Sequence, residues 1–86
     1  MVNMINSGSI NLLDVVALTV DLSQDNLWRG QVGTVVEILA DGAAFEVEFS
    51  DRDGRVYESL GLRPEQIMVL QFEPSLPKTQ AAMATV

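Results

Sequence analysis

Apolar and acidic residues alternate along residues 44–49, and this is the clearest pattern in the chain. Phe45, Val47 and Phe49 fall on one face of an extended segment, whereas Glu46 and Glu48 fall on the other. A period of two is typical of a β-strand with one buried face and one solvated face. The pattern therefore predicts a strand whose Phe and Val side chains lie in the core and whose carboxylates are exposed.

Further apolar segments, rich in β-branched residues, predict four more strands at residues 15–22, 32–39, 55–60 and 67–70. Turn signals separate them. Asp41-Gly42 favours a hairpin turn with positive φ angles, and Gly54 ends another turn. Pro64 suits the first position of a helical turn. Five short strands, with one long early loop and a short helical turn before the last strand, predict an all-β fold: a small five-stranded SH3-like barrel.

The 86 residues are enough for one domain. The patterned segments occupy residues 10–70, which we expect to form the SH3-like barrel domain. Residues 1–9 are polar and show no periodicity, so we expect a flexible leader. Residues 71–86 contain two prolines and a run of small residues, which predicts a flexible or partly ordered tail.

The formal net charge of −7 comes from 12 acidic and 5 basic residues. Such a surface repels a phosphate backbone, so it disfavours nucleic acid and favours a basic protein as the partner. The alternative, which we favour, is that the charge serves solubility. The sequence is also compatible with a homo-oligomer. No signal peptide is visible, and no apolar run approaches the ~18 residues of a membrane helix. We therefore expect a cytoplasmic protein that does not contact a membrane.

Catalytic chemistry has few candidate residues. The chain has no cysteine, no histidine and one lysine, Lys78, so the usual nucleophile–base pairs and Cys-based zinc sites are excluded. Asp51 and Asp53 could share a proton as acid and base, but aspartates in a Gly-terminated turn more often bind their own backbone. We expect no enzymatic activity, no catalytic residue and no cofactor.

Glu46, Glu48 and Glu58 form an acidic patch if their strands are neighbours, and a divalent cation could bind there weakly. The alternative is an ordinary solvated face, which we favour, and we expect no metal site.

Trp28 is the most informative single residue, because it stands in a polar loop at residues 23–30. Exposed aromatic side chains near the long first loop of SH3-type barrels bind extended peptides. Trp28 together with Tyr57, beside Asp21 and Asp25, is therefore our candidate partner surface. The alternative is that Trp28 covers one end of the barrel.

Residues 29–39, with Gly30 and Gly33, resemble the glycine-bearing strand of nitrile hydratase β-subunits and KOW-type ribosomal modules. We expect these glycines to lie where a side chain would collide with a neighbouring backbone. A longer pattern resembles a family of small bacterial proteins, frequent in cyanobacteria, known as domain-of-unknown-function family 4926. It comprises residues 10–18, 27–30, 33–36, 45–49 and 62–67. The resemblance implies an SH3-like fold and no particular activity.

These observations predict a small non-enzymatic module for protein interaction, or an accessory protein. An alternative is an antitoxin-like partner of a neighbouring gene product. A further alternative is a nucleic-acid-associated or ribosome-associated factor of the KOW type, which would need a basic stripe that the four arginines of the body do not supply.

Overall fold

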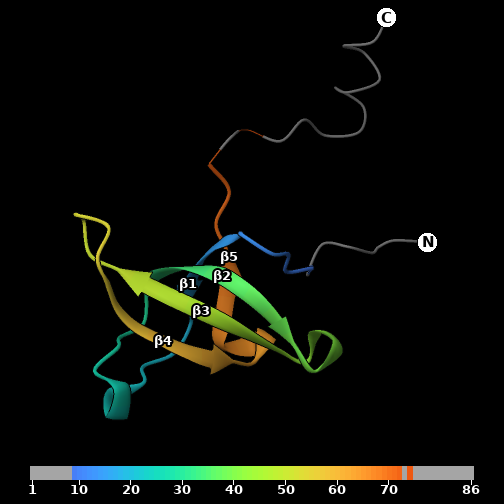
Figure 1. Cartoon of the computed structure of the whole chain (residues 1–86), viewed down its shortest axis with the longest axis horizontal. Helices are drawn as coiled ribbons and strands as arrows, with labels where there is room; N and C mark the ends of the chain where they lie inside the picture. Colours follow the sequence, from blue (N-terminus) through green and yellow to red (C-terminus); the bar gives the residue numbers. More distant parts are fainter. Residues whose placement is uncertain (1–8, 73, 75–86) are drawn as a thin grey trace, which may run out of the picture.

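The computed structural model describes residues 9–72 and 74. It contains five strands in one antiparallel sheet, ordered β4-β3-β2-β1-β5 (Figure 1). The strands are β1 (Val15–Leu18), β2 (Val32–Leu39), β3 (Ala44–Ser50), β4 (Val56–Leu62) and β5 (Ile67–Val69). The predicted all-β fold, with five strands and a short helical turn before the last, is confirmed. Most of the predicted leader and tail, at residues 1–9 and 71–86, lies outside the described residues.

The alternation predicted for β3 is present. Phe45, Val47 and Phe49 are buried, and Glu46 and Glu48 are only half-buried. The strands on either side keep this register, because Val47 lies opposite both Val35 of β2 and Leu60 of β4. A strand with an apolar face and a carboxylate-bearing face thus sits at the centre of the β2-β3-β4 half of the sheet.

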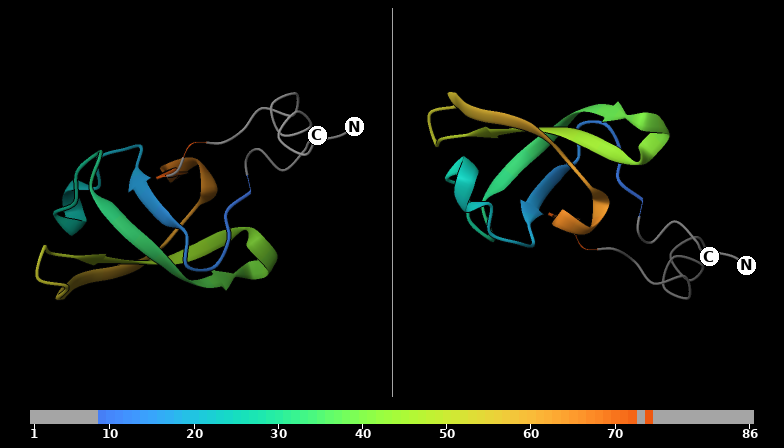
Figure 2. Two further views of the ribbon diagram at one scale, coloured as in Figure 1. Left: turned by 90° about the horizontal axis from the view of Figure 1, so that it is seen from above. Right: turned by 90° about the horizontal axis from the view of Figure 1, so that it is seen from below.

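A single core gathers side chains from all five strands. The sheet coils instead of lying flat, which brings its inward faces together (Figure 2). The buried members are Val16, Leu18, Leu27, Val35, Phe45, Val47, Phe49, Leu62 and Ile67. Leu27 is the member that comes from a loop, so the long first loop is anchored to the core.

Gly33 of β2 lies where the backbone of β3 comes very close. A Cβ atom there would be 2.7 Å from Val47 Cγ1 and 2.8 Å from the carbonyl oxygen of Glu48. Gly30 serves a different purpose, because its φ is +93° and open space surrounds it. The expected collision is therefore found at Gly33, whereas Gly30 supplies a turn conformation that residues with a side chain rarely adopt.

The first strand is shorter than predicted and ends at Leu18 instead of Leu22. Thr19 stays bonded to the segment before β5, because its N–H donates to the carbonyl of Gln66 at 2.9 Å and its hydroxyl donates to that of Glu65 at 2.7 Å. The chain then returns through a narrow loop, in which Leu22 and Leu27 form an isolated antiparallel bridge.

The fourth strand is longer than predicted, because Gly61 and Leu62 still pair with Glu46 and Phe45 of β3. A helical turn, η4 (Pro64–Gln66), follows with proline at its start, as expected. The Arg63 backbone N–H donates to Gln66 Oε1 at 2.8 Å, and Arg63 Nε donates to Glu65 Oε2 at 2.7 Å. The hydrogen bond from Arg63 lowers the pKa of the exposed Glu65 carboxyl. The hydrogen bonds of Arg63 hold the turn together, and β5, which pairs with β1, begins directly after it.

Candidate functional site

Trp28 and Tyr57 are joined through one side chain, Gln31. Gln31 Oε1 accepts a hydrogen bond from the Trp28 backbone N–H at 2.5 Å, and Gln31 Nε2 donates to the Tyr57 hydroxyl at 2.9 Å. The aromatic side chains remain 48% and 49% exposed. Gln31 thus holds the backbone of Trp28 and the hydroxyl of Tyr57, and two large aromatic residues that are half open to solvent form a surface suited to recognising another molecule.

The chain around Trp28 is held by several hydrogen bonds. Leu27 is fully buried beside it, and the Gly30 N–H donates to the Leu18 carbonyl at 2.8 Å. The Gln31 N–H donates to the Trp28 carbonyl at 3.0 Å, which closes a tight turn. The positive φ of Gly30 makes this turn possible. Trp28 is therefore presented by a rigid turn at the start of β2.

Tyr57 owes its position to an irregularity in the β3–β4 ladder. Phe49 pairs with Glu58 and Ser50 pairs with Val56, so Tyr57 is the extra residue of a β-bulge. Bulges bend a strand and redirect the side chains next to it. The residue that the bulge displaces, Tyr57, is the one whose hydroxyl accepts the hydrogen bond from Gln31.

The acidic residues of the candidate surface have different surroundings. Asp21 lies close to Trp28, since its Oδ1 accepts a hydrogen bond from the Arg29 backbone N–H at 2.8 Å. Asp25 is exposed in the 3₁₀ turn η2 (Ser23–Asp25). Within the described part of the chain, no hydrogen bond joins its carboxylate to Trp28 or Tyr57. The structure thus brings Trp28, Tyr57 and Asp21 together and leaves Asp25 outside this network.

Gln31 is the residue that the sequence analysis missed. Gly33 and Val35 face inward on β2, so the period of two assigns Gln31 to the inward side as well. A polar residue at an inward position needs a hydrogen-bonding partner, and this was the available signal. Its partners, one backbone N–H and one bulged tyrosine, depend on the tertiary fold.

The aspartates of the β3–β4 turn have a structural role. Asp51 Oδ1 accepts hydrogen bonds from the backbone N–H groups of Asp53 and Arg55, at 2.9 and 3.0 Å. The Asp51 N–H in turn donates to the Arg55 carbonyl at 2.9 Å. These bonds are what turn-forming aspartates make, and they favour the structural interpretation over shared proton transfer.

The prediction that Glu46, Glu48 and Glu58 form one acidic patch is wrong for Glu58. Glu58 lies opposite Phe49, on the inward-facing side of the ladder, whereas Glu46 and Glu48 face outward. Glu37 of β2 is the third acidic residue on the outward side, because it lies directly opposite Glu46. Among residues 9–72 and 74, no cluster of three acidic side chains has the arrangement of a metal site.

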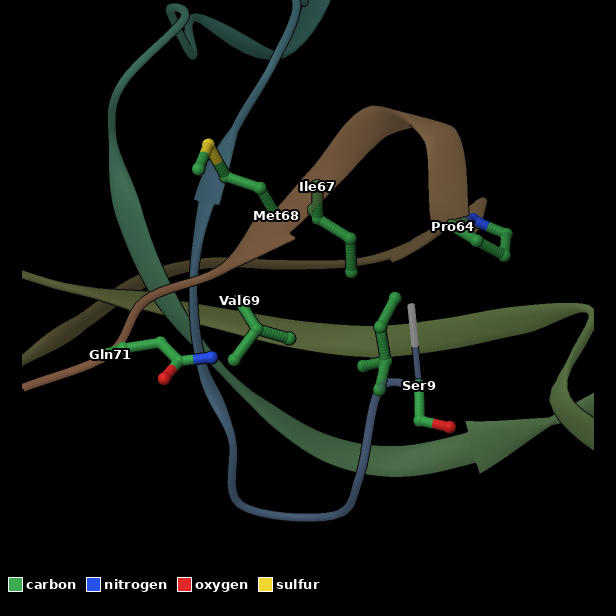
Figure 3. Close-up of a pocket in the computed structure, with 7 residues that line it drawn as sticks. Ser9, Pro64, Ile67, Met68, Val69 and Gln71 are labelled. Carbon is green, nitrogen blue, oxygen red and sulfur yellow. The ribbon is translucent and has the colours of Figure 1, made fainter. Parts of the chain in front are cut away.

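Two adjoining hollows lie beside η4 and share Ser9, Ile10 and Pro64. The larger, of about 360 Å³, is also lined by Ile67 and Val69 (Figure 3). The second, of about 340 Å³, reaches Phe45 and Ile38, an inward-facing residue that is nevertheless exposed. Met68 and Gln71 also line the first hollow, and Asp41 and Gly42 also line the second, so polar groups stand beside the apolar side chains. Neither lining brings together a pair of groups for acid–base chemistry.

A model of the family described as "Domain of unknown function (DUF4926)" matches residues 12–69, which spans all five strands and the Trp28 turn. The chain belongs to this family. No curated protein and no solved structure gives a significant match. In the part of this DUF4926 chain that the structure describes, no helix is long and apolar enough to cross a membrane.

Proposed function

We propose that this chain is a small non-enzymatic interaction module that binds a partner protein through Trp28, Tyr57 and Asp21. The observation that carries this proposal is the double hydrogen bond of Gln31. It links the backbone of Trp28 to the hydroxyl of Tyr57 while leaving about half of each residue open to solvent. Aromatic residues are enriched in protein interfaces, and the hydrogen bond to the Tyr57 hydroxyl reduces the conformational entropy that this side chain loses on binding.

Several further observations support an interaction role over an enzymatic one. The sequence has neither histidine nor cysteine, and Asp51 and Asp53 are used within their turn. The strand order, together with the helical turn before β5, supports an SH3-like architecture. The lack of cysteine fits the reducing cytoplasm, where we propose that the module acts.

The proposed partner is a protein with a basic binding surface. The net charge of −7 accelerates encounters with such a partner and slows encounters with nucleic acids. Asp21 places one carboxylate at the edge of the aromatic pair, where a lysine or arginine of the partner can reach it. Binding is therefore expected to weaken as salt rises, since the Debye length falls from about 30 Å at 0.01 M to about 8 Å at 0.15 M.

The test compares affinity capture from the source cells with three baits: the wild-type chain, Trp28→Ala and Leu12→Ala. Leu12 is an exposed apolar residue in the turn before β1, so it is a matched control. We expect a protein that the wild type and Leu12→Ala both capture and that Trp28→Ala loses, with all three melting temperatures similar. A Trp28→Ala chain that melts at a lower temperature but still captures the same protein would show that Trp28 has a structural role.

A further inference from the structure

The outward side of the sheet has an apolar part next to an acidic part, and this division is separate from the Gln31 network. The apolar part is a row of three residues, Met68 of β5, Ala17 of β1 and Val32 of β2. The register places Ala17 directly opposite both of the others. Figure 3 shows Met68 on the other side of β5 from the inward-facing Ile67 and Val69. We call these three residues the outward apolar row.

The outward apolar row is unusual for a sheet face that meets water. An antiparallel strand with one solvated face alternates between apolar and polar residues, as β3 does. In contrast, β1 is apolar at every position, and all three residues of β5 are apolar. Met68 is 54% exposed and Val32 is 45% exposed, whereas the small side chain of Ala17 between them is buried. The composition of these strands is that of a sheet covered on both sides, yet the described residues leave Met68 and Val32 open to solvent.

The acidic part lies on β2 and β3 and consists of Glu37, Glu46 and Glu48, which we call the outward acidic set. Glu37 and Glu46 are directly opposite each other, an arrangement of like charges that destabilises a sheet. The Ser59 hydroxyl donates to Glu46 Oε2 at 2.7 Å. Within residues 9–72 and 74, the ion pair is formed by Arg63 and Glu65, so no arginine neutralises this set. A cation supplied by a partner would relieve the repulsion.

The two parts meet on β2. Val15 of β1 lies opposite Thr34, and Thr34 lies opposite Glu48 of β3, so one line across three strands runs from apolar to acidic. Leu70 extends the apolar side, because its N–H donates to the Val15 carbonyl at 2.9 Å. A ligand that crosses the strands would therefore meet methyl groups first and carboxylates next.

We infer that this outward side is a second docking surface, and that its ligand is a protein segment with an apolar half followed by a lysine- or arginine-rich half. The apolar half would cover Met68 and Val32, which lie on either side of the buried Ala17, and the basic half would lie against Glu46 and Glu48. Charge complementarity selects this occupant: an anionic membrane or nucleic acid would be repelled by the acidic set, and a second copy of this acidic chain would bring like charges together.

The probe is a short synthetic peptide whose first half is leucine-rich and whose second half is lysine-rich. Its binding is measured by titration and by the amide resonances of the ¹⁵N-labelled full chain. A peptide with glutamate in place of lysine and one with serine in place of leucine serve as ligand controls. We expect the first peptide to bind with shifts at Ala17, Val32, Met68 and Glu48, and both controls to bind at least about tenfold more weakly.

Variants of the protein locate the site. We expect Met68→Ser and the double change Glu46→Gln with Glu48→Gln each to weaken the peptide about tenfold, and the double change also to remove most of its salt dependence. Met68 is exposed, so its substitution should leave the fold intact, and Val32→Ser provides a second test of the same row. Gln31→Ala, which unties Trp28 from Tyr57, should leave peptide affinity unchanged.

Three results would overturn the inference. Equal binding of the glutamate peptide would show that charge does not select the ligand. Loss of binding in Gln31→Ala, without loss in Met68→Ser, would assign the peptide to the aromatic surface. Self-association of the wild-type chain in sedimentation, abolished by Met68→Ser, would show that a second copy covers the row. The first and third results leave the proposal for Trp28 untouched, so the two proposals fail separately.

Discussion

Gly30 and Gly33 are three residues apart, and each meets a different physical requirement of the start of β2. Gly30 needs backbone freedom, since its φ of +93° closes the turn that presents Trp28. Gly33 needs the absence of a side chain, since β3 lies too close for a Cβ atom. Substitution by alanine should therefore lower the free energy of unfolding by different amounts at Gly30 and Gly33.

Gly33→Ala should destabilise the protein more than Gly30→Ala. At Gly33 the new methyl group would meet a backbone carbonyl of β3, which cannot move aside without disturbing the ladder. Overpacking of this kind costs about 1–3 kcal/mol or more. At Gly30 the cost is about 1–2 kcal/mol from the left-handed conformation alone. Urea unfolding of both variants measures the difference, and an equal or reversed order would contradict the close approach of β2 and β3.

At the scale of the element, β3 was predictable because its alternation is local. The end of β1 was not, because Leu18 pairs with Ile67, the first residue of β5, which is far away in the sequence. The bulge at Tyr57 is likewise a property of the β3–β4 pair. Trp28 and Tyr57 could be proposed as candidates from their residue types, but the Gln31 link between them required the fold.

The two faces of β3 should respond differently to substitution. Phe49→Ala removes a fully buried ring and is expected to cost about 3–5 kcal/mol, a large fraction of the stability of a small domain. Glu48→Gln keeps the shape of a half-buried outward side chain and removes only its charge, so it should change stability little. Thermal unfolding followed by circular dichroism makes the comparison. Similar melting temperatures for the two variants would contradict the register of β3.

Among residues 9–72 and 74, the core is formed by one continuous stretch of chain. The buried cluster and the partly buried residues that pack against it lie between Ile10 and Val69. The family match covers nearly the same stretch, residues 12–69. Periodic apolar segments separated by turn signals led to the prediction of a domain at residues 10–70. The division of the outward side into an apolar part and an acidic part could not be predicted, because it depends on which strands are neighbours in the sheet.

A chain of residues 9–72 should therefore fold by itself. It retains every core residue that the structure describes, both partners of the β1–β5 ladder, and Leu70, whose N–H donates to the Val15 carbonyl. A domain of this size buries only about 60% of the surface that its unfolded chain exposes, so its stability is modest and small losses are measurable. We expect dispersed amide resonances and a melting temperature within a few degrees of the full chain. A collapsed spectrum would show instead that residues 1–8 or 73–86 contribute to the stability of the fold, and chains that lack one end at a time would then identify which.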